Sequence, residues 1–231
     1  MSTSVLVVDD DLQVGRLVSI LTSRGYEVRT ASEGRSALAS IAARPPALVL
    51  TDLEMPGMSG IELCRRVRET WNVPIIVMSG NADGASELAA LDAGADDYFV
   101  KPLVSDKVLA RVHVCLRRRT EMPESVAFGV GQFHVDFDDR RVRVNGEPVR
   151  LTPKEFDLFV YMARRPNRVL RHKTLLGAVW GEAAAEQPEY LRVFMGQLRK
   201  KLESDPSNPR YLVTEPWVGY RFNPDGVLQR D

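Results

Sequence analysis

The first half of the chain alternates short apolar runs with amphipathic segments. Five runs, at residues 5–8, 26–31, 47–50, 74–78 and 97–100, are each followed by a segment of helical spacing, at 14–21, 36–42, 61–68, 85–92 and 104–118. Most of these runs are apolar throughout rather than at every second position, which is typical of strands buried on both faces. The alternation therefore predicts a doubly wound α/β fold, with a five-stranded parallel sheet covered by helices on both sides.

Polar side chains follow four of these runs. Asp9 and Asp10 follow the first run, Asp52 the third, Ser79 the fourth and Lys101 the fifth. Because the carboxyl ends of parallel strands meet at one edge of the sheet, we expect these side chains to lie close together. Taken singly, each also has a structural explanation: an Asp can simply open a turn, and Ser79 and Lys101 can be ordinary surface residues.

A cluster of carboxylates predicts a divalent cation. Like charges a few Å apart repel, and their oxygens suit Mg²⁺ (or Mn²⁺), which keeps several waters and shares its shell with a phosphate. Ser79 and Lys101 would then hold the oxygens of a transferring phosphoryl group, and Asp52 would be the nucleophile that forms an acyl phosphate. Neither G-x-G-x-x-G nor G-x-x-x-x-G-K-[ST] occurs, so a nucleotide is not the expected donor.

Residues 4–119 resemble a response-regulator receiver domain. The motifs that carry the resemblance are VVDDD (7–11), DLEMPGMSG (52–60), MS (78–79) and AGADDYFVKP (93–102). The resemblance implies a flavodoxin-like fold, phosphorylation of Asp52 by the phosphohistidine of a sensor histidine kinase, and a metal shell made by Asp9, Asp10, Asp52 and the backbone carbonyl of Glu54.

The resemblance also implies a two-state switch. On phosphorylation, Ser79 would move toward the phosphoryl oxygen and Tyr98 would turn inward into the space that this movement leaves. For Tyr98, simple packing remains the alternative role.

Dimerisation is implied through the predicted fourth helix, fifth strand and fifth helix. Asp97 and Arg111 stand at positions where the family typically makes a cross-subunit ion pair. A second pair usually has a basic residue on the fourth helix and an acidic one on the fifth, but here Glu87 and Lys107 reverse the signs. The reversal predicts an ion pair of opposite polarity and poor mixed dimers with ordinary relatives. Two solvated surface charges are the alternative.

Residues 120–125 predict a linker between two domains, at 1–119 and 126–231. The segment has no apolar period and contains a proline. The net charge is −1 over residues 1–120 and +3 over residues 126–231. That difference is too small to indicate nucleic acid by itself.

The second half predicts a different architecture. Alternating runs at 128–135, 141–144 and 148–151, with the turn Asn145-Gly146, predict a small antiparallel sheet. Thr152, Pro153 and Glu155 predict a helix start with a capping box. Two further helices, at 172–180 and 188–203, and a closing hairpin of strands at 211–214 and 219–222 complete the domain.

The helix at 188–203 has an apolar side and a side rich in Arg, Gln and Lys, which suits a major-groove reader or a solvated surface helix. Residues 126–223 resemble the winged-helix effector domain of the OmpR/PhoB class of transcription factors, through LTPKEF (151–156), LRKKL (198–202) and VGYRF (218–222). The resemblance implies a winged helix-turn-helix α+β fold. By that likeness Arg192, Arg199, Thr214 and Tyr220 are the candidate DNA contacts. Gln197 and Lys200 are further candidates because they lie on the polar side of the helix.

The wing tip departs from that class. Many relatives place there an arginine that reaches the minor groove, whereas this chain has Pro216 followed by Trp217. We therefore expect weaker or shape-based wing binding, and we expect Arg221 to structure the wing. Segments 190–199 and 214–216 resemble the KdpE branch of the class, which controls potassium-uptake genes.

Composition favours a cytoplasmic protein with no membrane partner. The chain is 44% hydrophobic and 27% charged, and no apolar run approaches the ~18 residues of a membrane helix. Its start lacks the basic region of a signal peptide. Cys64 and Cys115 are too few and too separated for a disulfide framework or a zinc site.

Together these features predict a two-component response regulator. A histidine kinase phosphorylates Asp52, the receiver forms a homodimer, and two winged helices bind adjacent half-sites of promoter DNA, with RNA polymerase as a further partner. Only its own phosphotransfer and autodephosphorylation are expected as catalysis. One alternative is a winged-helix transcription factor that dimerises without phosphate. Another is a phosphotransfer or phosphatase enzyme, which would need a further general acid or base that is not evident.

Overall fold

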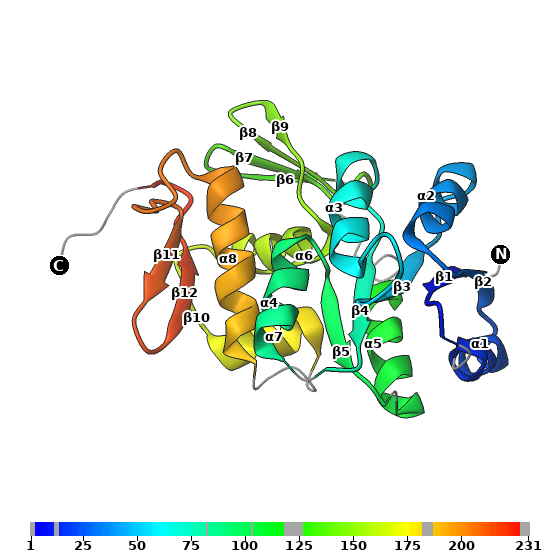
Figure 1. Cartoon of the computed structure of the whole chain (residues 1–231). Helices are drawn as coiled ribbons and strands as arrows, with labels where there is room; N and C mark the ends of the chain where they lie inside the picture. Colours follow the sequence, from blue (N-terminus) through cyan, green and yellow to red (C-terminus); the bar gives the residue numbers. More distant parts are fainter. Residues whose placement is uncertain are drawn as a thin grey trace. The chain divides into compact units, whose positions relative to one another are not determined.

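The computed structural model describes residues 3–11, 14–81, 83–102, 104–117, 127–181 and 187–226. The chain divides into two compact units, Met1–Thr120 and Glu121–Asp231 (Figure 1). The predicted linker at 120–125 lies outside the described residues. Within the described part of the chain, no helix combines the length and the apolar character needed to cross a membrane.

The first unit contains a five-stranded parallel sheet, as the alternation of runs predicted. Its strands are β1 (Ser4–Val8), β2 (Glu27–Ala31), β3 (Leu48–Asp52), β4 (Ile75–Ser79) and β5 (Asp97–Val100). All neighbours pair in parallel, in the order β2-β1-β3-β4-β5. From β1 the chain adds β2 on one side of the sheet, and from β3 it adds β4 and β5 on the other side. Ligands of such sheets bind beyond the carboxyl ends of the strands where this change of side occurs, here between β1 and β3.

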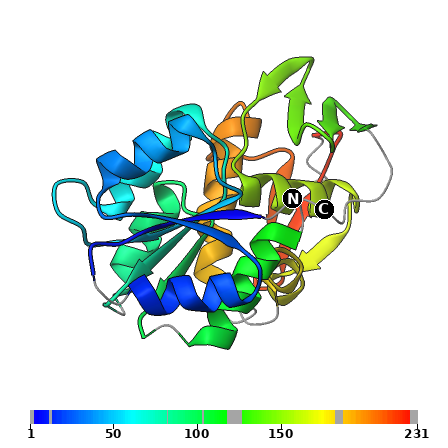
Figure 2. The ribbon, with the colours of Figure 1, turned by 90° about the vertical axis from the view of Figure 1, so that its right-hand side faces the viewer.

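Helices cover both faces of this sheet (Figure 2). They are α1 (Val14–Ser23), α2 (Gly34–Ala43), α3 (Gly60–Thr70), α4 (Gly84–Asp92) and α5 (Ser105–Arg117). On one face α1 contacts α5, while α2 contacts α3 and α3 contacts α4 on the other. This two-sided cover explains why the central strands are apolar at every position.

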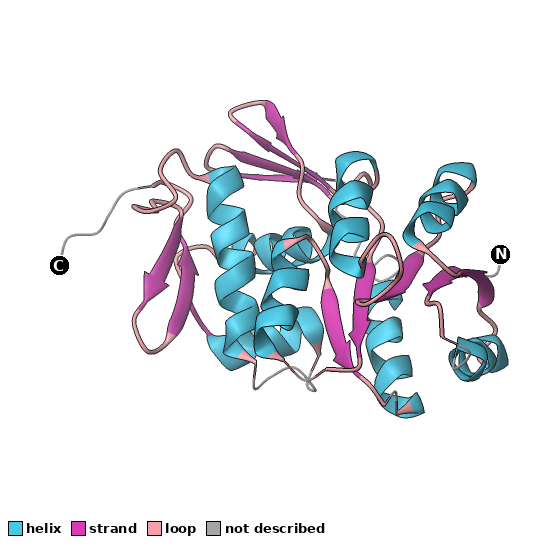
Figure 3. Ribbon diagram, viewed as in Figure 1, coloured by secondary structure: helices cyan, strands magenta, loops and turns pink. Residues whose placement is uncertain are grey.

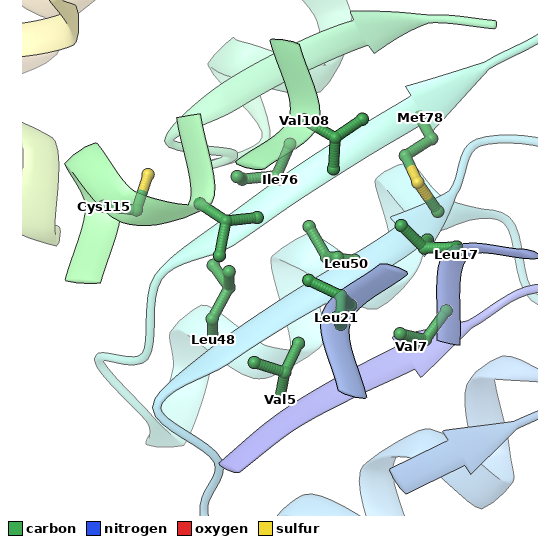
Figure 4. Close-up of a cluster of buried hydrophobic side chains, with 11 residues drawn as sticks. Val5, Val7, Leu17, Leu21, Leu48, Leu50, Ile76, Met78, Val108 and Cys115 are labelled. Atoms are coloured by element: carbon green, nitrogen blue, oxygen red, sulfur yellow. The ribbon is translucent and has the colours of Figure 1, made fainter. Parts of the chain in front are cut away.

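The core beneath α1 and α5 is built from alternate residues of three strands (Figure 4). Successive strand side chains point to opposite faces, so residues two apart share a face. The buried cluster comprises Val5 and Val7, Leu48 and Leu50, and Ile76 and Met78 from the strands, with Leu17, Leu21, Val108, Val112 and Cys115 from the helices. The intervening residues Leu6, Val49 and Val77 are fully buried as well.

The second unit contains three helices and two small antiparallel sheets, and the strand β10 of the second sheet falls between α6 and α7 along the chain (Figure 3). The first sheet contains β6 (Ala127–Val130), β7 (Phe133–Asp136), β8 (Arg141–Val144) and β9 (Glu147–Val149). The helices are α6 (Pro153–Ala163), α7 (His172–Trp180) and α8 (Pro188–Leu202). The second sheet contains β10 (Val169–Arg171), β11 (Leu212–Glu215) and β12 (Gly219–Phe222), in the order β10-β12-β11.

Two strand predictions in this unit were incomplete. The predicted strand at 128–135 is two strands, because the chain turns at Gly131, whose φ is +58°. A Cβ there would lie 2.4 Å from the carbonyl oxygen of Pro224, so glycine is required. The strand β10 was not predicted, since three residues are too few to show a period.

The start of α6 matches its prediction. The Thr152 hydroxyl accepts a hydrogen bond from the Glu155 backbone N–H at 3.4 Å, and the Glu155 carboxylate accepts one from the Thr152 N–H at 2.7 Å. This capping box satisfies two donors that the first helical turn leaves unpaired. It fixes the helix whose Phe159 packs against Phe133 and Phe222 in the core.

Candidate functional sites

The carboxyl edge of the parallel sheet gathers acidic side chains. Asp52 is the last residue of β3, and Asp9 and Asp10 directly follow β1. One carboxylate oxygen from each of the three lies within 4.8 Å of the others. Asp9 and Asp52 are each only 8% exposed, whereas Asp10 is exposed. The structure thus brings together the three carboxylates that the sequence placed at this edge.

Lys101 joins the cluster from the end of β5. Its Nζ lies 3.0 Å from Asp9 Oδ2 and 3.0 Å from Asp52 Oδ2, so one ammonium bridges two buried carboxylates. Burial raises the pKa of Asp52 above its ordinary value, and the ion pair with Lys101 opposes that rise. Burial lowers the pKa of Lys101, but its bonds to Asp9 and Asp52 more than compensate, so that pKa is raised.

The backbone around Asp52 is held by the start of α3. The Leu53 N–H donates to Asp52 Oδ1 at 2.8 Å, and the Gly60 N–H donates to the Leu53 carbonyl at 2.8 Å. A Cβ on Gly60 would lie 2.2 Å from the Asp52 carbonyl oxygen. Only glycine therefore lets α3 begin against the end of β3. From the sequence, Gly60 was predicted only as part of a helix start. Its position at the end of the motif at 52–60 is the signal that could have indicated this second role.

Ser79 and Tyr98 lie close together on the neighbouring strands β4 and β5. Ser79 ends β4 fully buried, and its hydroxyl accepts from the Asn81 N–H at 3.0 Å. The ring of Tyr98 is 3% exposed, and its hydroxyl donates to the Asn81 carbonyl at 3.3 Å. Burial raises the pKa of Tyr98, while a side-chain hydrogen bond with Ser79 opposes this shift. Tyr98 thus already occupies an inward position, and the backbone of Asn81 links it to Ser79.

In the second unit, α8 carries fewer free polar groups than its sequence suggested. Arg192 and Lys200 are exposed, as predicted for its polar side. Gln197 is only 9% exposed, so little of its side chain is accessible in this conformation, and its role as a DNA contact stays a prediction. Gln197 lies three residues from Phe194 and next to Leu198, and helical spacing turns it toward the face that those residues bury.

Arg199, a predicted DNA contact, makes its hydrogen bonds within the domain. Its Nε and Nη2 donate to the Leu212 carbonyl at 3.0 and 2.6 Å, and Nη2 donates to the Thr214 hydroxyl at 2.7 Å. Its guanidinium lies 5.9 Å from the ring of Tyr220, which is only 6% exposed. Burial lowers the pKa of Arg199 and raises that of Tyr220. Arg199 therefore fastens α8 to the β11–β12 hairpin, and Thr214 remains the exposed member of this group.

Both units match known families. The response regulator receiver domain matches residues 5–113, and the C-terminal domain of transcriptional regulatory proteins matches residues 146–222. The chain is 44% identical over 223 residues to the transcriptional regulatory protein KdpE of Mycobacterium tuberculosis, covering 95% of this chain and 99% of that protein.

The chain belongs to the OmpR/PhoB class of response regulators.

Two further similarities support the class. The DNA-binding response regulator MtrA of Mycobacterium tuberculosis is 36% identical over 225 residues, which cover 97% of this chain and 98% of MtrA. The crystal structure of DrrB, an OmpR/PhoB homologue from Thermotoga maritima, has 30% sequence identity and a TM-score of 0.52, and the match covers 96% of this chain and all of DrrB. The predictions of a receiver, of a winged-helix domain and of a DNA-binding transcriptional regulator are thereby confirmed.

On the receiver face formed by α4, β5 and α5, the acidic and basic residues are arranged in an unexpected way. Asp97 is buried in β5 and forms an ion pair with Arg111 of α5 within the same chain. The Arg111 guanidinium lies 5.4 Å from the ring of Phe99, which is two residues from Asp97 on the strand. This pair was predicted to cross a subunit boundary, so a dimer would have to share or exchange it. Glu87 on α4 is partly buried and Lys107 on α5 is exposed.

In the effector domain, Arg221 structures the wing as expected. Its Nε donates to Glu215 Oε1 at 2.7 Å, and the two residues lie on the paired strands β12 and β11.

In the receiver, Glu54 lies two residues beyond Asp52 and is exposed.

Proposed function

We propose that Asp52 accepts a phosphoryl group from the phosphohistidine of a partner kinase and that this modification controls DNA binding. A carboxylate oxygen of Asp52 attacks the phosphorus, the P–N bond breaks as the new P–O bond forms, and the electron pair leaves with the imidazole nitrogen. The observation that carries the proposal is the Lys101 ammonium 3.0 Å from both Asp9 and Asp52. A phosphoryl group on Asp52 lies within reach of this ammonium.

The acidic cluster fits a divalent cation. Three carboxylates face one ammonium, which leaves an excess of negative charge that oxygen-preferring cations relieve. Asp9, Asp10, Asp52 and the Glu54 carbonyl are the proposed ligands of Mg²⁺ or Mn²⁺, which would supply charge neutralisation at the phosphoryl oxygens. Ser79 and Lys101 would donate to the remaining oxygens, and the resulting acyl phosphate would hydrolyse slowly as the only other catalysis.

The proposed readout is a homodimer on DNA. Exposed Arg192, Lys200 and Thr214 would contact the duplex, while Arg199 and Tyr220 would hold the wing against α8. The α4–β5–α5 face, with Glu87, Lys107, Asp97 and Arg111, is the proposed dimer surface. A regulator that acts on chromosomal DNA and RNA polymerase works in the cytoplasm. The resemblance of α8 and the wing to the KdpE branch supports potassium-transport genes as targets.

Phosphorylation by a small donor tests this proposal. With phosphoramidate and Mg²⁺, we expect intact mass measurement to show one added phosphoryl group on the unmodified chain and none on Asp52→Asn. A chelator should slow the reaction strongly because the carboxylates lose their cation. Asp106→Asn, an exposed acid in the first turn of α5, is the matched control and should react normally. Equal uptake by Asp52→Asn would refute Asp52 as the acceptor.

A further inference from the structure

The tip of the wing is a tight turn with an unusual third residue. In residues 215–218 the Val218 N–H donates to the Glu215 carbonyl at 3.1 Å, and Trp217 has a φ of +66°. Proline at the second position and a positive φ at the third are the features of a type II turn, which favours glycine or asparagine there. A bulky L-residue in this region is a backbone outlier. The turn therefore holds a strained tryptophan.

Packing against the described residues gives no compensation for this strain. Trp217 is 98% exposed, and the neighbouring Val218 is 43% exposed. Tryptophan is usually well buried, because its large apolar surface is costly to hydrate. A strained conformation kept without packing gain indicates a requirement outside the fold. Since the described residues leave the indole uncovered, Trp217 is available to contact another molecule.

The surroundings of the tip suit double-stranded DNA. The hairpin is fastened to α8 by Arg199, so the tip has a fixed relation to the helix proposed to read the major groove. The Glu215 carboxylate is paired with Arg221 at 2.7 Å, which reduces its repulsion of phosphates. Arg171 lies opposite Gly219 on β10 and is exposed, as is Lys173 at the start of α7. An apolar tip with an exposed cation, Arg171, on the neighbouring strand matches a groove bordered by phosphates.

We propose that Trp217 is a minor-groove wedge. When α8 occupies the major groove, the indole would enter the adjacent minor groove, pack against sugars and base edges, and partly unstack a base step. Such wedges act best at flexible pyrimidine–purine steps, which deform at low cost. The wedge would read the deformability of the duplex rather than its charge. This inference rests on the proposed DNA interface of α8.

Trp217→Gly is the informative variant, because glycine is the residue that the turn prefers. We expect the thermal midpoint of the full chain to stay level or rise by about 3 °C. Affinity for a pool of duplexes selected from random sequence by the full chain should fall about tenfold. The salt dependence of binding should keep its slope, since an indole displaces no counterions.

Arg192→Ala separates failure of the wedge from failure of the proposed interface. A lost phosphate contact should lower the affinity and reduce the salt slope by about one. If Arg192→Ala changes nothing, the proposed interface of α8 is wrong. If Arg192→Ala weakens binding and Trp217→Gly does not, the wedge alone is overturned.

Fluorescence gives a direct readout of the contact. Trp217 is far more exposed than Trp180, which is 1% exposed, and than the partly buried Trp71. The part of the iodide quenching of tryptophan fluorescence that disappears in Trp217→Gly therefore comes from Trp217. We expect saturating duplex to suppress this part of the quenching. Unchanged quenching at saturation overturns the wedge. So does a result in which Trp217→Gly impairs binding of RNA polymerase but leaves duplex affinity intact.

Discussion

At the scale of single residues, Asp52 is kept reactive by opposing influences. Burial raises its pKa from 3.8, and Lys101 limits the rise. A carboxyl whose pKa is raised on folding binds protons more tightly in the folded state. The free energy of unfolding therefore falls as pH increases from 3.8 through the folded-state value. At neutral pH the burial of the ionised Asp52 carboxylate therefore costs stability, while the raised pKa of Lys101 acts in the opposite direction.

Gly60 provides the residue-scale prediction. In Gly60→Ala the new Cβ would lie 2.2 Å from the Asp52 carbonyl, so α3 or the end of β3 must shift. We expect a loss of about 1–3 kcal/mol of unfolding free energy, measured by urea denaturation, and slower phosphorylation of Asp52.

Gly84→Ala is the matched control. Gly84 is the first residue of α4, and a Cβ there meets no atom within 4 Å. That variant should be neutral or slightly stabilising. If both alanine variants behave alike, the close approach at Gly60 does not position Asp52.

At the scale of elements, periodicity predicted the ten elements of the receiver to within about two residues at most ends. It also placed Asp9, Asp52 and Lys101 at one edge, because parallel strands leave no other arrangement. Periodicity failed where the outcome depends on long-range packing. It could not show that Arg199 turns toward Leu212. Gln197, by contrast, lies three residues from Phe194, so helical spacing does place it toward the buried side of α8, and the prediction overlooked this.

The α4–β5–α5 face gives the element-scale prediction. Glu87→Lys should weaken dimers formed with an acyl-phosphate mimic by about fivefold, because Lys107 would then face a like charge. Adding Lys107→Glu should restore them, as sedimentation velocity can measure.

Glu69→Lys, on the exposed side of α3, is the control for a general charge effect. Dimers unaffected by Glu87→Lys would mean that Glu87 and Lys107 are merely solvated charges.

At the scale of the whole molecule, phosphorylation of the receiver is proposed to control the DNA-binding unit. The sequence predicted both units because each carries its own motifs, and the 44% identity to KdpE spans them together. One feature favours the alternative of a regulator that needs no phosphate. Tyr98 is already inward while Lys101 still bonds to Asp52. The switch therefore has to be tested through its output rather than by the position of Tyr98.

The decisive measurement is the affinity of the full chain for duplex selected from random sequence, with and without an acyl-phosphate mimic and Mg²⁺. The account expects the mimic to raise affinity about tenfold or more in the unmodified chain and to leave Asp52→Asn unchanged. If Asp52→Asn binds as tightly as the activated chain, or if the mimic changes neither, phosphorylation does not control DNA binding and the central claim is wrong.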